Sequence, residues 1–270
     1  MTTTRDLREA AGTEPITMLT AYDASTAAVV EEAEIDVILV GDSMGNTVLG
    51  YDSTLPVTVE EVQSRTAAVA RATTEPLVVA DMPFLSFGVS EADSVENAGR
   101  MLKEADADAV KLECGPHTVE TTERLVEVGV PVMAHLGLTP QHVNQLGGYR
   151  RQGTDEAAAR ELLELAEAHE EAGAFALVLE HVPANLAEQV TAALETPTIG
   201  IGAGSETDGQ VLVITDVLGL SERAPPFAEQ FGDVREEMAN AVESFRTAVE
   251  EGEFPAEEHS HHESELDDIY

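Results

Sequence analysis

The sequence is poor in the residues that stabilise secreted proteins and membrane spans. Its 270 residues include one cysteine and no tryptophan, and aromatic residues make up 4%. The single cysteine, Cys114, cannot form an intrachain disulfide, so nothing indicates an oxidising compartment. No apolar run approaches the roughly 20 residues that span a bilayer. The opening MTTTRDLREAAGT lacks the apolar stretch of a signal peptide. We therefore expect a soluble, cytoplasmic protein with no membrane partner.

Positive charge is scarce as well. The chain has 14 Lys and Arg against 52 Asp and Glu, which gives a formal net charge of -38. A surface of this sign repels nucleic acid, whose protein partners carry basic patches. The hydrophobic fraction of 43% excludes wholesale disorder. Because the acidic surplus is spread over most predicted helices, it is typical of a halophilic protein adapted to multimolar salt; the alternative is an ordinary solvated acidic surface.

Short apolar runs alternate with longer Ala- and Glu-rich stretches of helical periodicity, which predicts a parallel sheet covered by helices. We expect strands at Ile16–Thr20, Val37–Val40, Leu77–Ala80, Ala109–Leu112, Val132–His135, Ala176–Leu179, Thr198–Ile201 and Val211–Ile214. We expect helices at Val59–Ala72, Ser94–Glu104, His117–Glu127, Asp155–Ala172, Ala184–Leu194 and Asp233–Glu250. Eight such strands, in a chain close to the roughly 250 residues of one α/β barrel, predict a single (β/α)8 TIM barrel.

The predicted barrel forms one catalytic domain over residues 1–256. The remaining residues, 257–270, read EEHSHHESELDDIY and are polar and acidic. We expect this C-terminal tail to be mobile. Its histidines His259, His261 and His262 are either metal ligands or, without further ligands nearby, incidental members of a polar tail.

Polar residues stand where the predicted strands end, the edge at which barrels of this kind place their chemistry. In chain order they are Asp42, Ser43, Asp81, Lys111, Glu113, His135 and Glu180. Asp42, Asp81 and Glu113 come from neighbouring strands, so their carboxylates can enter one coordination sphere. Carboxylate oxygens suit a hard cation such as Mg²⁺, and the absence of a paired Cys/His set argues against structural zinc.

Lys111 and Glu113 alternate along the predicted strand AVKLE, so their side chains point to the same face. The residues between and before them, Leu112 and Val110, are apolar and point to the other face. A buried ammonium is costly unless it is paired. Lys111 is therefore either a functional group inside the barrel or one half of a structural salt bridge.

Glu180 closes the apolar segment LVLEHVP, where partial burial would make it a better general base. The alternative is a carboxylate that caps a helix or forms an ion pair before Pro183. His135 is either a second candidate of this kind or a hydrogen-bonded core histidine. TIGIGAG, from Thr198 to Gly204, lacks the spacing of a nucleotide-binding loop and indicates only a close approach of backbone to a ligand or strand.

These residues lie in longer blocks that resemble the ketopantoate hydroxymethyltransferase family. The blocks are LVGDSMGNTVLGYDSTLPVT (Leu39–Thr58), VADMPF, AVKLE, HLGLTPQHVNQLGGYRRQG (His135–Gly153), LVLEHVP and IGIGAG. With TAYD at Thr20–Asp23 and EEHS at Glu257–Ser260, the resemblance covers nearly the whole chain.

The resemblance implies transfer of a hydroxymethyl group from 5,10-methylenetetrahydrofolate, or a related methylene-pterin, to 3-methyl-2-oxobutanoate. The product, 2-dehydropantoate, belongs to pantothenate and coenzyme A biosynthesis. The resemblance assigns the Mg²⁺ site to Asp42, Asp81 and Glu113, the keto-acid site to Asp42, Ser43, Asp81 and Lys111, and the proton acceptor to Glu180. It also implies a homo-oligomer, since the family forms decamers.

Two alternatives remain at this stage. One is another metal-dependent keto-acid lyase or mutase of the isocitrate lyase or phosphoenolpyruvate mutase type. Such lyases depend on a catalytic cysteine loop, whereas Cys114 lies beside the fourth strand. The other is a keto-acid binding protein without turnover, for which a base such as Glu180 is unnecessary.

The charge balance predicts that the protein needs salt. Lowering the salt from about 3 M to about 0.05 M lengthens the Debye screening length to more than about 10 Å, so repulsion among the acidic side chains grows. We expect the oligomer to dissociate and the fold then to be lost. Sedimentation velocity and circular dichroism across a salt series measure these two changes. A particle that is unchanged over this range would contradict the halophilic interpretation.

Overall fold

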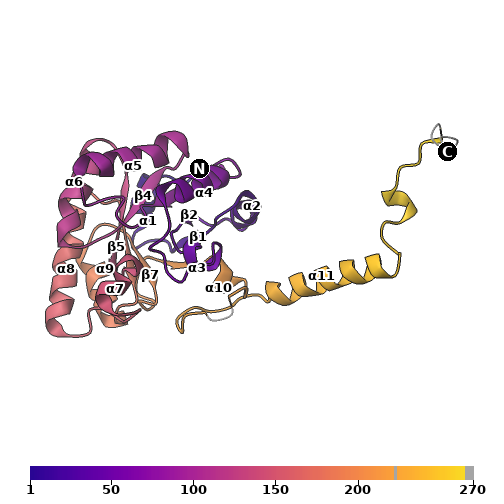
Figure 1. Ribbon diagram of the computed structural model, residues 1–270. Coiled ribbons are helices and arrows are strands. Elements are labelled where there is room, and N and C mark those ends of the chain that lie inside the picture. Colours follow the sequence, from indigo (N-terminus) through magenta and orange to yellow (C-terminus); the bar gives the residue numbers. More distant parts are fainter. Residues whose placement is uncertain (222–223, 265–270) are drawn as a thin grey trace. The chain divides into compact units, whose positions relative to one another are not determined.

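The computed structural model describes residues 1–221 and 224–264 and contains a closed barrel of parallel strands in the order β1-β2-β3-β4-β5-β6-β7-β8 (Figure 1). The strands are β1 (Ile16–Thr20), β2 (Val37–Val40), β3 (Leu77–Asp81), β4 (Ala109–Glu113), β5 (Val132–Gly137), β6 (Ala176–Glu180), β7 (Thr198–Ile201) and β8 (Gly209–Leu212). The predicted (β/α)8 barrel is confirmed. Seven of the strands begin at the predicted residue.

The prediction for the eighth strand was wrong by two residues. β8 starts at Gly209, which lies opposite Ile16 of β1, and a Cβ added there would come within 2.4 Å of the Ile16 carbonyl oxygen. Only glycine allows this close approach, so pairing begins there. The strand also ends earlier, because Ile214 begins a helix and its N–H donates to the Thr20 hydroxyl at 2.9 Å.

Helices surround the strands in Figure 1. Those of the barrel unit are α1 (Thr4–Ala10), α2 (Ala24–Glu32), α3 (Met44–Thr47), α4 (Val59–Ala70), α5 (Glu91–Glu104), α6 (Val119–Glu127), α7 (Val143–Leu146), α8 (Glu156–Glu171) and α9 (Ala184–Ala193). Further along the described chain come α10 (Ile214–Val217) and α11 (Val234–Glu250). Three short 3-10 turns accompany them: η1 (Pro116–Thr118), η2 (Pro140–His142) and η3 (Glu257–His259). All six predicted helices are present, with ends that differ by a few residues.

Local capping explains the main differences from the predicted helices. α5 begins before the predicted Ser94 because the side chain of Ser90 accepts a hydrogen bond from the Asp93 N–H. The unpredicted helix α1 has a capping box formed by Thr3 and Asp6. The unpredicted α2 is capped by Asp23. Between β7 and β8, residues 202–208 contain no helix, so this unit departs from the regular alternation.

The hydrophobic core fills the barrel interior. Alternate residues of each strand point inward, among them Val79 of β3, Ala109 of β4 and Val178 of β6. Leu7 of α1 belongs to the same buried cluster, and Arg8 donates to the carbonyl oxygens of residues 173 and 174, just before β6. The first helix therefore packs at the N-terminal end of the barrel, which leaves the C-terminal end for the polar residues.

The chain divides into two compact units. One comprises Met1–Ile214 with Pro225–Ala228, and the other comprises the described residues of 215–224 and of 229 onward, including α11. The predicted domain boundary at residue 256 stays a prediction, as does mobility of the tail, whose residues 265–270 lie outside the described part. No helix in residues 1–221 and 224–264 is long and apolar enough to cross a membrane.

Gly137 marks a tight contact between β5 and β6 at the catalytic end of the barrel. Its φ is +97°, and an added Cβ would lie 2.2 Å from the Glu180 carbonyl oxygen. That oxygen also accepts the Leu138 N–H at 2.8 Å. The backbone that carries Glu180 is thus held against a residue that cannot have a side chain.

We expect Gly137→Ala to destabilise the protein more than Gly129→Ala. Both glycines have a positive φ, but an added Cβ at Gly129 meets no atom within 4 Å. The difference isolates the steric clash and should be about 1–3 kcal/mol in the free energy of unfolding. Denaturant unfolding of both variants at one high salt concentration measures it. Equal losses would show that the backbone moves aside at no cost.

Candidate active site

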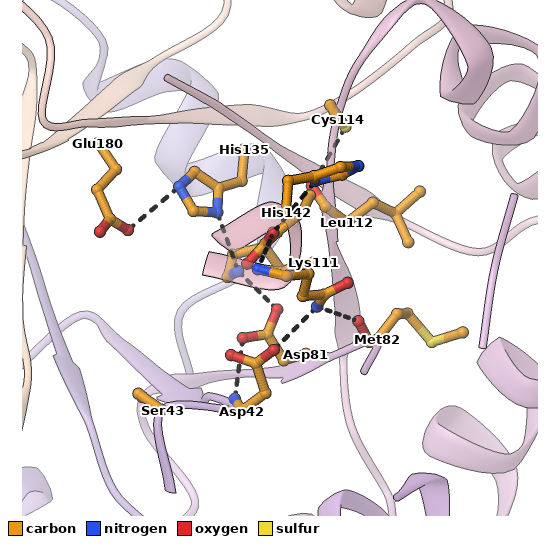
Figure 2. A network of polar contacts seen from close by, with 12 residues as sticks. Asp42, Ser43, Asp81, Met82, Lys111, Leu112, Cys114, His135, His142 and Glu180 are labelled. Atoms are coloured by element: carbon orange, nitrogen blue, oxygen red, sulfur yellow. Dashed lines mark hydrogen bonds and ion pairs between the residues drawn. The ribbon is translucent and has the colours of Figure 1, made fainter. Parts of the chain in front are cut away.

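The strand register brings the predicted polar residues to one end of the barrel interior. Asp81 pairs across strands with Lys111, Glu113 pairs with His135, and Gly137 pairs with Glu180. Alternation along β3, β4, β5 and β6 turns these side chains inward above the apolar layers. Figure 2 shows polar contacts that join Asp81, Lys111, His135 and Glu180.

An ion pair between Lys111 and Asp81 lies at the centre of this network. Lys111 Nζ is 2.6 Å from Asp81 Oδ1, and both side chains are buried, with 5% and 3% of their surface exposed. Asp81 Oδ2 accepts a hydrogen bond from the Asp42 N–H at 3.1 Å, which ties the end of β3 to the loop after β2. Lys111 thus forms a buried salt bridge, one of the two interpretations that the sequence left open, and its functional role stays a prediction.

Three carboxylates share this single ammonium. Asp42, Asp81 and Glu113 are 4%, 2% and 1% exposed. Burial, and then the charge of Asp81, raise the pKa of Asp42 to about 7. Burial and the charge of Asp42 raise the pKa of Glu113 well above its ordinary value. Burial alone would lower the pKa of Lys111, but the surrounding carboxylates raise it, so the ammonium stays charged.

The donor set fits a hard divalent cation. Three buried carboxylates face one lysine, so the cluster lacks positive charge, and all its oxygens are of the kind that Mg²⁺ prefers. In the described residues, no three His, Cys, Asp or Glu side chains form a ready-made metal site. Such a cation would take one or two of these carboxylates and complete its shell with water or substrate oxygens.

His135 links Lys111 to Glu180. Lys111 Nζ lies 3.4 Å from His135 Nδ1, and His135 Nε2 lies 3.3 Å from Glu180 Oε2 (Figure 2). An ammonium can only donate, so Nδ1 accepts and the proton of the neutral ring is on Nε2, facing the carboxylate. Burial, and then the Lys111 charge, lower the pKa of His135, which favours this neutral form. Glu180 keeps 17% of its side-chain surface exposed, so it can reach a substrate.

Ser43 follows Asp42 at the start of α3, where its hydroxyl lies 2.8 Å from the hydroxyl of the buried Tyr22. Sequence analysis did not single out Tyr22, although it follows β1 within TAYD. Gly41 makes room for this arrangement, since an added Cβ would lie 2.8 Å from Ser43 Oγ. The loop after β2 thus carries a carboxylate and a hydroxyl in fixed positions.

The sequence pattern did not single out Gln141 either. This residue is hydrogen-bonded to two of the three buried carboxylates. Its backbone N–H donates to Glu113 Oε2 at 2.9 Å, and its side-chain Nε2 lies 2.9 Å from Asp42 Oδ2 and 3.0 Å from the Met82 carbonyl oxygen. It is 4% exposed. A buried amide after a strand end was the available signal, because such a group must find hydrogen-bond partners.

The glycine-rich turn after β7 packs against protein. An added Cβ at Gly202 would lie 2.7 Å from the Phe227 ring, and one at Gly204 would lie 2.5 Å from Ala184 Cβ at the start of α9. Close approach was the expectation from the sequence, and these contacts account for it. The described tail histidines belong to no group that could hold a metal ion.

The raised pKa of Asp42 predicts an unusual pH dependence for the metal-free protein. Between about pH 4 and 7 the folded state holds a proton that the unfolded state has lost, so stability falls as the pH rises through this window. Asp42→Asn is neutral throughout. We expect this variant to show a smaller fall, since only the raised pKa of Glu113 remains, and near about pH 8 to exceed the wild type by on the order of a few kcal/mol. Chemical unfolding of chelator-treated proteins near these two pH values measures it; parallel curves would contradict the assignment.

Nearly the whole chain is similar to known proteins. The model of the family described as ketopantoate hydroxymethyltransferase matches residues 1–257. A 3-methyl-2-oxobutanoate hydroxymethyltransferase of Halobacterium salinarum is 69% identical over 96% of this chain and 94% of its own. That of Haloarcula marismortui is 67% identical over 100% of both chains, and that of Moorella thermoacetica is 54% identical over 92% of both.

Solved structures with the same barrel are more distant in sequence. A phosphoenolpyruvate phosphomutase from Streptomyces platensis has a TM-score of 0.63 at 16% identity, covering 93% of this chain and 88% of its own. A phosphonopyruvate hydrolase in complex with oxalate and Mg²⁺ has a TM-score of 0.60 at 14% identity, covering 96% and 93%. These likenesses support the fold alone. The family match and the close relatives show that the chain belongs to the ketopantoate hydroxymethyltransferase family of transferase enzymes.

Proposed function

We propose that the protein transfers a hydroxymethyl group from 5,10-methylenetetrahydrofolate, or a related methylene-pterin, to 3-methyl-2-oxobutanoate to give 2-dehydropantoate. The reaction belongs to pantothenate and coenzyme A biosynthesis. The observation that carries this proposal is the pairing, at one end of the barrel, of a partly exposed carboxylate, Glu180, with a buried cluster of carboxylates around Lys111. The first can remove a proton, and the second can hold a keto acid and a cation.

The carboxylates of Asp42 and Asp81 would hold Mg²⁺, and Glu113 would bind it directly or through water. When bound, the ion supplies the positive charge that acidifies the carbon next to the keto group. Three buried carboxylates with one ammonium support the proposed cation, because their negative charge is only partly compensated. Asp42, Ser43, Asp81 and Lys111 would together form the keto-acid site.

Each group of the chain has a distinct task in this mechanism. Lys111 would fix the carboxylate of the keto acid and offset the negative charge that develops, aided by the Ser43 hydroxyl. Glu180 would accept the C3 proton. His135 Nε2 lies 3.3 Å from Glu180 Oε2 and would help to orient this carboxylate. The carbanion-like C3 would then form a carbon–carbon bond to the one-carbon unit of the pterin. The bonds between that carbon and the pterin nitrogens break, one water supplies the oxygen of the new hydroxymethyl group, and the pterin leaves without its one-carbon unit.

Family membership separates this function from the two alternatives. The phosphoenolpyruvate phosphomutase and the phosphonopyruvate hydrolase share the barrel but are only 16% and 14% identical to this chain, whereas the haloarchaeal transferases reach 69%. A keto-acid binding protein without turnover would have no use for a partly exposed carboxylate beside a histidine at the position of Glu180.

We further propose a homo-oligomer, as the family decamer implies, in a salt-rich cytoplasm. Helix α11 has no buried residue, and its apolar side chains Met238, Val242 and Phe245 are 55%, 68% and 58% exposed. Residues 238, 242 and 245 recur at helical spacing, and an apolar stripe of this kind is expected to pack against another protein surface. Relatives from Halobacterium salinarum and Haloarcula marismortui support the halophilic interpretation of the net charge of -38.

The mechanism predicts that proton removal can be observed without the pterin. With Mg²⁺ and 3-methyl-2-oxobutanoate in D₂O, the wild type should exchange the C3 proton for deuterium. Proton NMR of the C3 position measures the rate. Glu180→Gln keeps the size of the side chain and removes its basicity. We expect exchange to fall by a factor on the order of 10²–10⁴, the usual contribution of a positioned general base.

A chelator should abolish exchange by the wild type and Mg²⁺ should restore it. Glu188→Gln is a matched control, because Glu188 lies on the outer helix α9. Exchange at the wild-type rate in Glu180→Gln would exclude this residue as the base and leave His135 as the next candidate. Exchange by the wild type without 2-dehydropantoate formation on addition of the methylene-pterin would exclude the proposed carbon donor.

A further inference from the structure

We propose that Gln141 is a positioning residue that fixes the distance between Asp42 and Glu113 and thereby selects Mg²⁺ over larger cations. The inference rests on the proposed metal site and goes beyond it, because Gln141 itself would not touch the metal. The residue lies in η2, directly after Pro140, in the loop that follows β5. From there it contacts the loop after β2, the end of β3 and the end of β4.

The backbone of Gln141 is itself hydrogen-bonded to the carboxylate cluster. Its N–H donates to Glu113 Oε2 at 2.9 Å. The loop is fixed on its other side by the Leu138 N–H, which donates to the Glu180 carbonyl oxygen at 2.8 Å. Rigid attachment at both points means that the side-chain amide starts from a defined place.

The side-chain amide then joins two further segments. Nε2 has two hydrogens, and it lies 2.9 Å from Asp42 Oδ2 and 3.0 Å from the Met82 carbonyl oxygen. In residues 1–221 and 224–264, it is the one side chain recorded as a hydrogen-bond donor to the Asp42 carboxylate. With 4% of its surface exposed, the amide has little water to replace either bond.

These bonds decide which carboxylate oxygens remain for a cation. Gln141 occupies Oδ2 of Asp42 with its side chain and Oε2 of Glu113 with its backbone. Each carboxylate oxygen has two lone pairs, so Asp42 Oδ1 and Glu113 Oε1, which Gln141 does not bind, are the oxygens most open to a cation or to a water bound to one. Because one residue is hydrogen-bonded to both carboxylates, it restricts how far they can move apart.

A fixed separation matters for the choice of metal. Mg²⁺ requires near-ideal octahedral geometry at about 2.0–2.1 Å, whereas Ca²⁺ accepts irregular shells at about 2.3–2.6 Å. Residues that orient metal ligands typically contribute about 10–100-fold to metal affinity. Loss of the Gln141 amide should therefore weaken Mg²⁺ binding by about 10–100-fold and Ca²⁺ binding by less.

The test is calorimetric titration of Mg²⁺ and Ca²⁺ into the whole, metal-stripped protein at one high salt concentration, without substrate. Gln141→Met retains the length of the side chain and removes its donors; Gln141→Asn retains an amide but is one methylene too short. Gln145→Met is the matched control, because Gln145 is an exposed glutamine on the neighbouring helix α7. Melting temperature and particle size show whether each variant is folded.

We expect both Gln141 variants to lose more Mg²⁺ affinity than Ca²⁺ affinity, and the Gln145 variant to bind both ions as the wild type does. Wild-type Mg²⁺ affinity in a folded Gln141 variant would overturn the inference and leave the proposed metal site intact. Equal losses for the two ions would overturn the selective role. Failure of the wild type itself to bind Mg²⁺ would overturn the proposed metal site, and this inference with it.

Discussion

Lys111 and Asp81 form an ion pair inside the barrel, 2.6 Å apart, with almost no contact with solvent. Two further carboxylates, Asp42 and Glu113, share the same buried space. Removing charged groups from water costs several kcal/mol for each group, so such a cluster persists only if its charges are compensated. One ammonium compensates part of the negative charge. The rest is left to protons, as the raised pKa values of Asp42 and Glu113 indicate, or to a cation.

Negative charge exceeds positive charge both on the protein surface and in the buried cluster, but the surface is in contact with dissolved ions and the cluster is not. The surface of a chain with a net charge of -38 lies in water, where concentrated salt screens repulsion within about 3 Å at 1 M. Buried carboxylates are screened far less by dissolved ions. High salt can therefore support the acidic surface, but the interior depends on groups that the fold itself places there, such as Lys111 and the Gln141 amide.

The apolar layers of the barrel make the polar end possible. Tight backbone contacts leave the strand ends little freedom. One of them places Gly137 against the Glu180 carbonyl. Side chains carried by these strands are then held in register, with Asp81 opposite Lys111 and Glu113 opposite His135. The proposed mechanism, which divides binding and proton removal between β4 and β6, would need this rigidity, because the groups would act on one small substrate.

The sequence by itself determined the barrel, seven strand starts and the strand-end positions of the polar residues, because the alternation of residues in a strand and the apolar runs are local properties. It also carried the family resemblance. The tertiary structure alone decided which of these residues touch. Asp81 and Lys111 are 30 positions apart in sequence and meet through strand register, while Gln141 and Asp42 are 99 positions apart and meet through a loop. No local pattern encodes such contacts. The buried amide of Gln141 acquires its partners only when the closed barrel brings the ends of β2, β3 and β4 within its reach.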